Sequence, residues 1–274
     1  MPEPSELLPL IGVLMVIGGI AGVLAGLLGV GGGIVLVPAF YYVFSSMGYD
    51  SPYLMQICLA TSLATIIVTS SRSVLSHNRK GAVDWEVLRT WAPGIAVGAV
   101  IGVLVVASLR SAVLQGIFGV LGLGIGFYMA LGRTNWRLAD KMPEGPTRAV
   151  MSAAVGFLSV LMGIGGGSFG VPLMTLHGKP IHKAVATAAG FGALIALPSV
   201  IGFFLVGIPA DVRPPFTVGA VNLAAFGVVV MMTLLTAPLG VRLAHKLDPK
   251  PLKRVFAVFL IVVAGNMIRK AAGW

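Results

Sequence analysis

Long apolar segments separated by short polar gaps run along the chain from about Leu7 to about Ile268. A helix needs roughly 20 mostly apolar residues to cross a hydrocarbon layer about 30 Å thick. Most of the segments reach that length, and no gap between them is long enough for a separate soluble domain. We therefore expect one integral membrane domain with ten helical segments, at residues 7–29, 34–47, 53–76, 90–108, 112–132, 149–164, 168–177, 184–207, 215–238 and 252–268.

Segments 34–47 and 168–177 are too short to cross as straight helices. Each follows its predecessor across a glycine run, 29–33 or 163–167, that contains no charged residue. Three consecutive glycines interrupt a helix, and the freed backbone groups must be buried in protein or line a polar cavity because lipid cannot satisfy them. We expect each pair to form a helical hairpin or a broken helix.

The chain contains two related halves. The stretch 22–38 (GVLAGLLGVGGGIVLVP) matches the stretch 156–172 (GFLSVLMGIGGGSFGVP) without a gap. Further matching positions are Ala60 and Thr61 with Ala186 and Thr187, Gly81 with Gly207, and Gly102, Leu114 and Phe118 with Gly240, Leu252 and Phe256. This predicts a first transmembrane repeat at 1–142 and a second at 143–274. Because each repeat has an odd number of segments, we expect the two repeats to be inverted, as in many secondary transporters.

The expected fold is thus an all-α polytopic membrane protein of two inverted repeats, each with a glycine-broken helical hairpin and about three full transmembrane helices. Composition agrees, because only 10% of the residues are charged, against about a quarter in a soluble domain. The net charge of +10 is scattered over the gaps, so nucleic acid is not an expected partner.

Positive charge also predicts the orientation, because cytoplasmic loops collect Lys and Arg. If every segment changes side, or if each glycine hairpin dips in and returns, most of the 19 Lys and Arg residues lie on one side of the membrane. The other side holds only Arg110, Arg213, Arg269 and Lys270. We expect the first side to be cytoplasmic and both termini to lie outside the cytoplasm.

The two glycine tips are the strongest candidates for a solute site. Inverted repeats would bring them together near the midplane, where N–H groups at half-helix N-termini attract an anion. The alternative is that these glycines serve only close helix packing. Nearby polar side chains would complete the site, although Ser and Thr often bond only to their own helix backbone. The predicted binding residues are Gly31, Gly32, Gly33, Thr61, Ser62, Gly165, Gly166, Gly167, Ser168, Thr187 and Asn222.

Two basic side chains near the end of the third segment are predicted to gate the pathway or to attract anions. Arg72 lies near the expected cytoplasmic mouth, with snorkelling to the interface as the alternative, and His77 follows it. All nine carboxylates lie at the amino terminus or in gaps, so a proton relay through a buried Asp or Glu is not supported. No HExxH site, paired carboxylates or Ser-His-Asp order is present, so we expect neither enzymatic activity nor a metal or cofactor.

The signatures GLLGVGGGIVLVP and MGIGGGSFGVPLM, with the ATSLATI stretch and the HNRKGAVDW loop at 77–85, resemble the sulfite exporter TauE/SafE family of membrane permeases. The resemblance runs over nearly the whole chain, although the second half lacks the His and Trp of that loop. It implies a carrier for small sulfur-containing anions such as sulfite, sulfoacetate or other organosulfonates, usually exporting them across the bacterial inner membrane.

The residues themselves favour an alternating-access anion carrier whose partners are a small anionic substrate and membrane lipid. They leave open another small organic anion as the solute, an anion channel, or a structural subunit of a larger membrane complex. Self-association into a homo-oligomer is also left open.

Overall fold

The computed structural model describes residues 4–28, 32–131, 136–244 and 249–273, which are almost entirely helical. The helices are α1 (Pro4–Leu28), α2 (Gly33–Ser46), α3 (Leu54–Asn78), α4 (Trp85–Ser108), α5 (Ser111–Leu131), α6 (Gly145–Leu161), α7 (Gly167–Leu176), α8 (Ile181–Phe204), α9 (Leu223–Ala244) and α10 (Pro249–Ala271). Within these described residues, two strands, β1 (Thr217–Val218) and β2 (Val221–Asn222), form a short antiparallel hairpin between α8 and α9.

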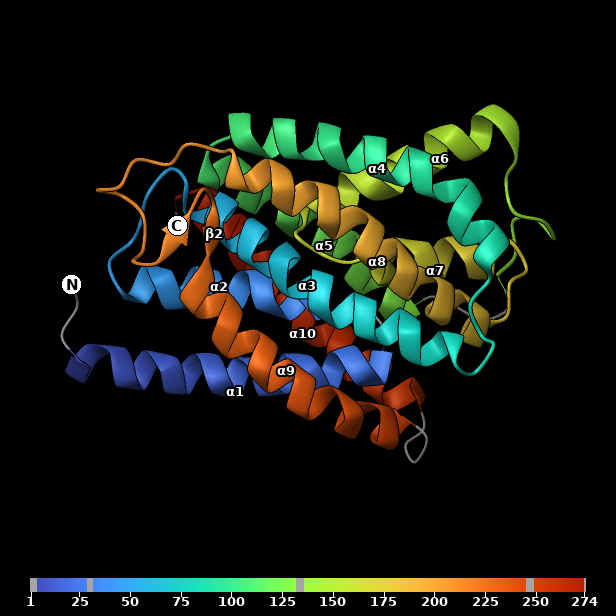
Figure 1. Ribbon diagram of the computed structural model, residues 1–274, viewed down its shortest axis with the longest axis horizontal. Helices are drawn as coiled ribbons and strands as arrows, with labels where there is room; N and C mark the ends of the chain where they lie inside the picture. Colours follow the sequence, from blue (N-terminus) through green and yellow to red (C-terminus); the bar gives the residue numbers. More distant parts are fainter. Residues whose placement is uncertain (1–3, 29–31, 132–135, 245–248, 274) are drawn as a thin grey trace.

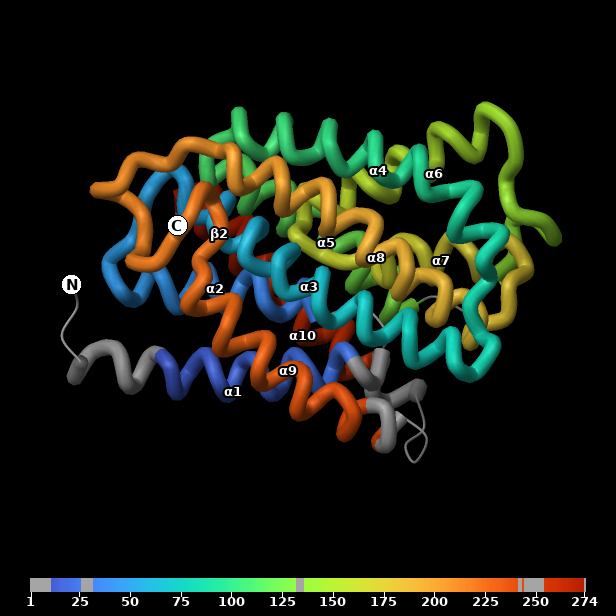
Figure 2. The backbone as a smooth tube through the Cα atoms, viewed as in Figure 1, coloured from blue at the N-terminus to red at the C-terminus, as the bar shows by residue number. Residues whose placement is uncertain are grey.

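Five helices in the described part of the chain are long and apolar enough to cross a membrane: α3, α4, α5, α8 and the Leu223–Gly240 part of α9. The predicted all-α polytopic membrane fold is therefore confirmed, and each predicted segment corresponds to one helix. As expected, α2 and α7 are short, with 14 and 10 residues. In Figure 2 their backbones extend over only part of the length that α3 and α8 cover.

Two helix starts differ from the predicted segments by five residues or more, and both differences come from side-chain caps. α4 begins at Trp85 because the Asp84 carboxylate accepts the N–H of Val87 at 3.2 Å. α9 begins only at Leu223, where Asn222 Oδ1 accepts the N–H of Ala225 at 2.9 Å. The residues just before α9 form the β1–β2 hairpin instead of a helix.

The helices lie roughly along the long axis of the molecule, so their connections gather at two ends (Figure 1). The α3–α4 and α7–α8 connections lie at the right end of that view, and the α2–α3, α4–α5 and α8–α9 connections lie at the left. α1 starts and α10 ends toward the left end as well. The described connections that were expected on the same side of the membrane thus lie at the same end of the molecule. Which end faces the cytoplasm stays a prediction.

The contacts between helices are preserved when α1–α5 are exchanged with α6–α10. α1 packs on α9 as α6 packs on α4, α2 packs on α3 as α7 packs on α8, and the α3–α8 and α5–α10 pairs map onto themselves. Individual residues follow the exchange: a Cβ atom at Gly240 would overlap Val23 O, and a Cβ at the matching Gly102 would lie 3.2 Å from Phe157 O. Two copies of one unit related by a twofold axis produce this pattern. The inverted orientation of the two repeats in a membrane and the boundary between them at residue 142 stay predictions.

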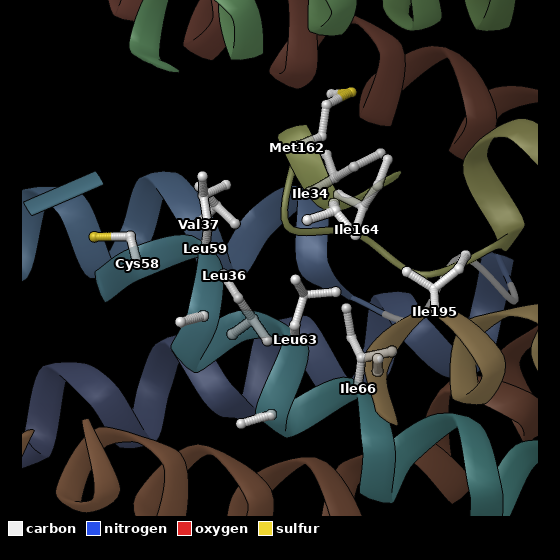
Figure 3. Packing of buried hydrophobic residues seen from close by; sticks show 14 of the residues in the cluster. Ile34, Leu36, Val37, Cys58, Leu59, Leu63, Ile66, Met162, Ile164 and Ile195 are labelled. Carbon is white, nitrogen blue, oxygen red and sulfur yellow. The ribbon is translucent and has the colours of Figure 1, made fainter. Parts of the chain in front are cut away.

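The two hairpins meet inside the bundle. A Cβ atom at Gly33, the first residue of α2, would lie only 2.7 Å from the carbonyl oxygen of Gly163, which precedes α7. Apolar side chains from both tips and from α3 fill the surrounding space (Figure 3), and Ile34, Leu63 and Ile164 are 1% exposed or less. These side chains form a buried apolar block around the contact between the two tips.

Candidate anion site

A cavity of about 960 Å³ lies between α1, α3, α7, α8 and α9. Glycines 165–167, which are buried, form its inner end, where α7 starts. Arg79 and Lys80, which are exposed, lie at its mouth. The remaining lining residues are Ala25, Ile67, Val68, Thr69, Ser70, Ser71, Arg72, Ser73, Leu75, Ser76, His77, Ala188, Ala189, Thr233, Leu234, Ala237 and Pro238.

The first turn of α7 reaches the cavity because Gly166 allows α7 to approach α8 closely. A Cβ atom at Gly166 would overlap Phe191 and lie 3.0 Å from Ala188 O. The first N–H groups of a helix have no acceptor within the helix, and they form its partially positive end. Gly166 therefore allows two things: α7 packs closely on α8, and the first backbone N–H groups of α7 lie beside the cavity.

A buried hydroxyl accompanies this helix start. Ser168, in the first turn of α7, is only 6% exposed, and its Oγ atom has no hydrogen-bond partner among the described residues. An unpartnered buried hydroxyl is costly unless a ligand or water completes it. Ser168 directly follows the glycine tip but does not itself line the cavity, so its role in binding stays a prediction.

The α3 wall of the cavity is polar and ends in a basic cluster. The cluster consists of the cationic Arg72, Arg79 and Lys80 together with His77, which is counted as neutral at pH 7. None of the described carboxylates lies within ion-pair distance of these four side chains. Thr69 contributes less, because its Oγ1 donates to Thr65 O at 3.2 Å within its own helix. The mouth therefore attracts anions without a neutralising acid beside it.

The structure brings together part of the predicted site. Gly165, Gly166, Gly167, Arg72 and His77 all line the cavity. Gly32 and Gly33 do not line it, since Gly33 packs against the Gly163 carbonyl instead. Gly31 lies outside the described residues. In the described chain, then, only the second glycine tip faces the cavity.

The other predicted binding residues lie outside the cavity lining and hold the helices together. Ser62 donates from Oγ to Gly163 O at 2.7 Å, which fixes α3 to the second tip. Thr61 Oγ1 accepts the N–H of Asn222 at 3.0 Å, and Thr187 Oγ1 accepts the N–H of Asp84 at 2.9 Å. Asn222 also donates from Nδ2 to Pro215 O at 2.8 Å. These side chains join helices in this structure, and their role in binding stays a prediction.

Sequence reasoning overlooked most of the α3 wall. Ser70, Ser71, Ser73 and Ser76 line the cavity, as does Thr233 from α9. The signal was present in the run TSSRSVLSHNRK at 69–80, where hydroxyl and basic side chains are concentrated at the end of an apolar segment. Which of these side chains share one cavity depends on how α3 packs against α7, α8 and α9.

An ion pair joins the two halves close to the same end of the molecule. Lys179 Nζ lies 2.7 Å from Asp84 Oδ2, between the α7–α8 and α3–α4 connections. Burial alone would raise the pKa of Asp84, but Lys179 and the N–H of Val87 outweigh it and hold the pKa below its usual value. Asp84 therefore stays ionised and fixes the start of α4 to the second half.

The whole arrangement can be compared with known proteins. Residues 14–267 match the family model described as sulfite exporter TauE/SafE. The chain belongs to this family. It is 31% identical to a probable membrane transporter protein of Haemophilus influenzae over 93% of this chain and 97% of that protein. It is 25% identical to one of Methanocaldococcus jannaschii, over 96% and 97% of the two chains.

A third relative, the probable membrane transporter protein YunE of Bacillus subtilis, is 28% identical over 93% of this chain and 96% of its own. No solved structure matches the chain. The family and these relatives are membrane transporters, not enzymes. The protein is accordingly a multi-pass membrane transporter of the TauE/SafE family.

Proposed function

We propose that this TauE/SafE transporter is a secondary carrier that exports small sulfur-containing anions, such as sulfite, sulfoacetate or other organosulfonates, by alternating access. The cavity carries the proposal, because it combines the N-terminus of α7 with the four-residue basic cluster. Its volume of about 960 Å³ suits a small molecule with some of its water. The cation-rich end would face the cytoplasm of a bacterial inner membrane.

The binding donors would come from one tip rather than two. Residues 165–167 lie at the inner end of the cavity and Ser168, with its unpartnered hydroxyl, follows them in α7, whereas Ile34, the position in α2 that matches Ser168, belongs to the buried apolar block. A sulfonate group presents three acceptor oxygens and no donor, so it suits a site built from N–H, O–H and cationic groups. A zwitterion such as taurine would bring its own cation next to the basic cluster.

The driving force follows from the lack of acids in the cavity. No Asp or Glu is found among the described lining residues, so an anion would cross without a carboxylate to carry a compensating proton. An anion leaving a negative interior gains about 2.3 kcal/mol per charge per 100 mV. That energy corresponds to a concentration ratio on the order of 50 for a monovalent anion.

The test is uptake and efflux of sulfite, sulfoacetate, taurine and acetate in proteoliposomes that hold the purified protein, with and without an imposed voltage. The proposal expects saturable, voltage-dependent flux of sulfite or the sulfonate, and little flux of taurine. Flux that does not saturate would favour an anion channel. Flux of acetate equal to that of the sulfonate would indicate that the carrier is not specific for sulfur-containing anions. Flux that requires a pH gradient and does not respond to voltage would contradict export driven by the membrane potential.

The cavity itself is tested by a matched pair of arginine variants. Arg72→Gln removes a cation from the lining and should raise the KM for the sulfonate about tenfold, since tenfold in affinity is about 1.4 kcal/mol. Arg137→Gln is the control, because Arg137 is also exposed and basic but pairs with Asp140 outside the cavity. Equal effects of the two substitutions would show that the cavity is not the binding site.

A further inference from the structure

We propose that the solute leaves through a second vestibule, closed in this structure, between the C-terminal half of α8 and α4. The inference rests on the proposed transport and identifies the residues of its exit pathway. The starting observation is that the helix contacts are the same in the two halves, so that α3 corresponds to α8 and α9 corresponds to α4. The α3 and α9 walls of the cavity therefore have counterparts in α8 and α4. An outlet would therefore form at the end of the molecule opposite the cavity.

The residues of the second vestibule follow from the match of Thr61 with Thr187, extended along α3 and α8 without a gap. The matching positions are Ile195 for Thr69, Ser199 for Ser73, Gly202 for Ser76 and Phe203 for His77. The first-half partner in each pair lines the cavity. The second-half partner is therefore expected to face solute when its own side opens.

That second side is shut. Ile195, Ser199 and Phe203 are fully buried, and a Cβ atom at Gly202 would lie 2.9 Å from Val103 Cγ1 of α4. α8 and α4 are thus in direct contact where the matching α3 and α9 stand apart around the cavity. One of two equivalent interfaces is open and the other closed, which is the asymmetry that alternating access requires.

The β1–β2 hairpin covers the closed side. The N–H of Ala220 donates to Phe203 O at 2.9 Å, and a Cβ atom at Gly219 would overlap the same carbonyl oxygen. The N–H of Asn222 is held by Thr61 Oγ1. Opening the second vestibule therefore requires the hairpin to leave the end of α8.

The two vestibules differ in charge. The positions that match the four members of the basic cluster are Pro198, Phe203, Leu205 and Val206, none of them cationic. The second vestibule would thus hold an anion much less tightly than the cavity does. The solute would be captured at the basic end and released where none of the matching positions carries a cation.

Single-cysteine labelling tests the assignment with a matched pair of serines. Cys58 is the only cysteine, so Cys58→Ala gives a thiol-free background for Ser73→Cys in the cavity and Ser199→Cys in the second vestibule. In detergent, a polar maleimide should label Ser73→Cys at least tenfold faster than Ser199→Cys. In proteoliposomes that transport sulfoacetate, adding it should speed the labelling of Ser199→Cys. Sulfoacetate is used rather than sulfite, because sulfite itself adds to maleimides.

A further variant needs no substrate and so separates this inference from the proposed function. Gly202→Leu would force α8 away from Val103, and it should speed the labelling of Ser199→Cys about tenfold. Gly207→Leu is the control, since nothing lies within 4 Å of a Cβ at that position. The thermal midpoint and the labelling of Ser73→Cys check that the variant is folded, and Gly202→Ala replaces it if it is not.

Unchanged labelling of Ser199→Cys in a folded Gly202 variant would overturn the second vestibule. So would labelling of Ser199→Cys as fast as that of Ser73→Cys in the parent protein. If Gly202→Leu opens the site but no tested anion is transported, the vestibule stands and the proposed substrate class fails.

Discussion

Gly166 lies where the first turn of α7 crosses α8, with Phe191 and the Ala188 carbonyl where its side chain would be. At this residue scale, stability and the proposed function depend on the same missing Cβ atom. A side chain would separate α7 from α8 and would move the backbone donors at the inner end of the cavity. Gly192 in α8 has a similar constraint, because a Cβ atom there would overlap the Ser70 hydroxyl.

Gly166→Ala should lower the free energy of unfolding by about 1–3 kcal/mol, the usual cost of adding a methyl group to a packed contact. It should also reduce sulfonate transport more than the loss of folded protein explains. Thermal unfolding in detergent and flux per folded molecule measure the two effects. Gly124→Ala is the control: Gly124 lies within α5 with nothing within 4 Å, so alanine there should be neutral or slightly stabilising.

The Asp84–Lys179 pair predicts a pH dependence. Because the pKa of Asp84 is lowered in the folded protein, despite the opposing effect of burial, ionised Asp84 stabilises the fold above its unfolded pKa of about 3.9. This contribution, about 1 kcal/mol, is lost as the pH falls through the lower folded pKa. Unfolding measured from pH 6 downward should show the loss in the wild type and not in Asp84→Asn, which keeps a capping oxygen. An identical decline in both proteins would contradict it.

At the scale of elements, the short helices and the β1–β2 hairpin have separate tasks. α2 and α7 bring the two tips into contact inside the bundle, and only α7 presents its start to the cavity. The hairpin packs on the end of α8 and leads into α9 through the Asn222 cap. Residues that were predicted to bind solute, Thr61 and Asn222, join this hairpin to α3.

Asn222→Ala distinguishes the two roles. It removes the cap of α9 and the Nδ2 bonds to Pro215 O and Thr217 Oγ1, so the free energy of unfolding should fall by about 2 kcal/mol. The KM for the sulfonate should not change if the side chain only holds the hairpin. Asn222→Asp keeps the capping oxygen and should recover about half of the stability. A higher KM in a fully folded variant would support the binding role that the sequence suggested.

At the scale of the whole molecule, two halves with matching helix contacts surround one open cavity, which carries the basic cluster, and we infer a second, closed pathway at the opposite end. The exchange of halves explains why the fold can offer access at either end. The differences between the halves explain why the two accesses need not have the same affinity. Both properties require the complete pair of repeats.

Transport should therefore have a lower KM when the sulfonate is presented at the basic end than at the other, by about tenfold or more at low salt. Raising the ionic strength to about 1 M shortens the Debye length to about 3 Å and should reduce the difference. Initial rates in proteoliposomes of defined orientation measure both values. Equal KM values at low salt would mean that the basic cluster does not contribute to binding.

The sequence by itself determined the helices, the duplication, the two glycine tips and the concentration of basic residues at one set of connections. These features follow from local hydrophobicity, backbone freedom and spacing, which each segment carries wherever it is placed. The starts of α4 and α9 were predicted less well, because a single capping side chain sets each of them.

Only the tertiary structure decided which glycine tip faces the cavity and which groups form hydrogen bonds with the buried hydroxyls. The two tips have nearly the same sequence, yet Gly33 is packed against Gly163 while residues 165–167 line open space. Thr61 and Thr187 match in the sequence, but one holds the hairpin and the other the start of α4. The partner of a polar group is the nearest group that packing brings within about 3 Å, and residues distant in the chain supply it.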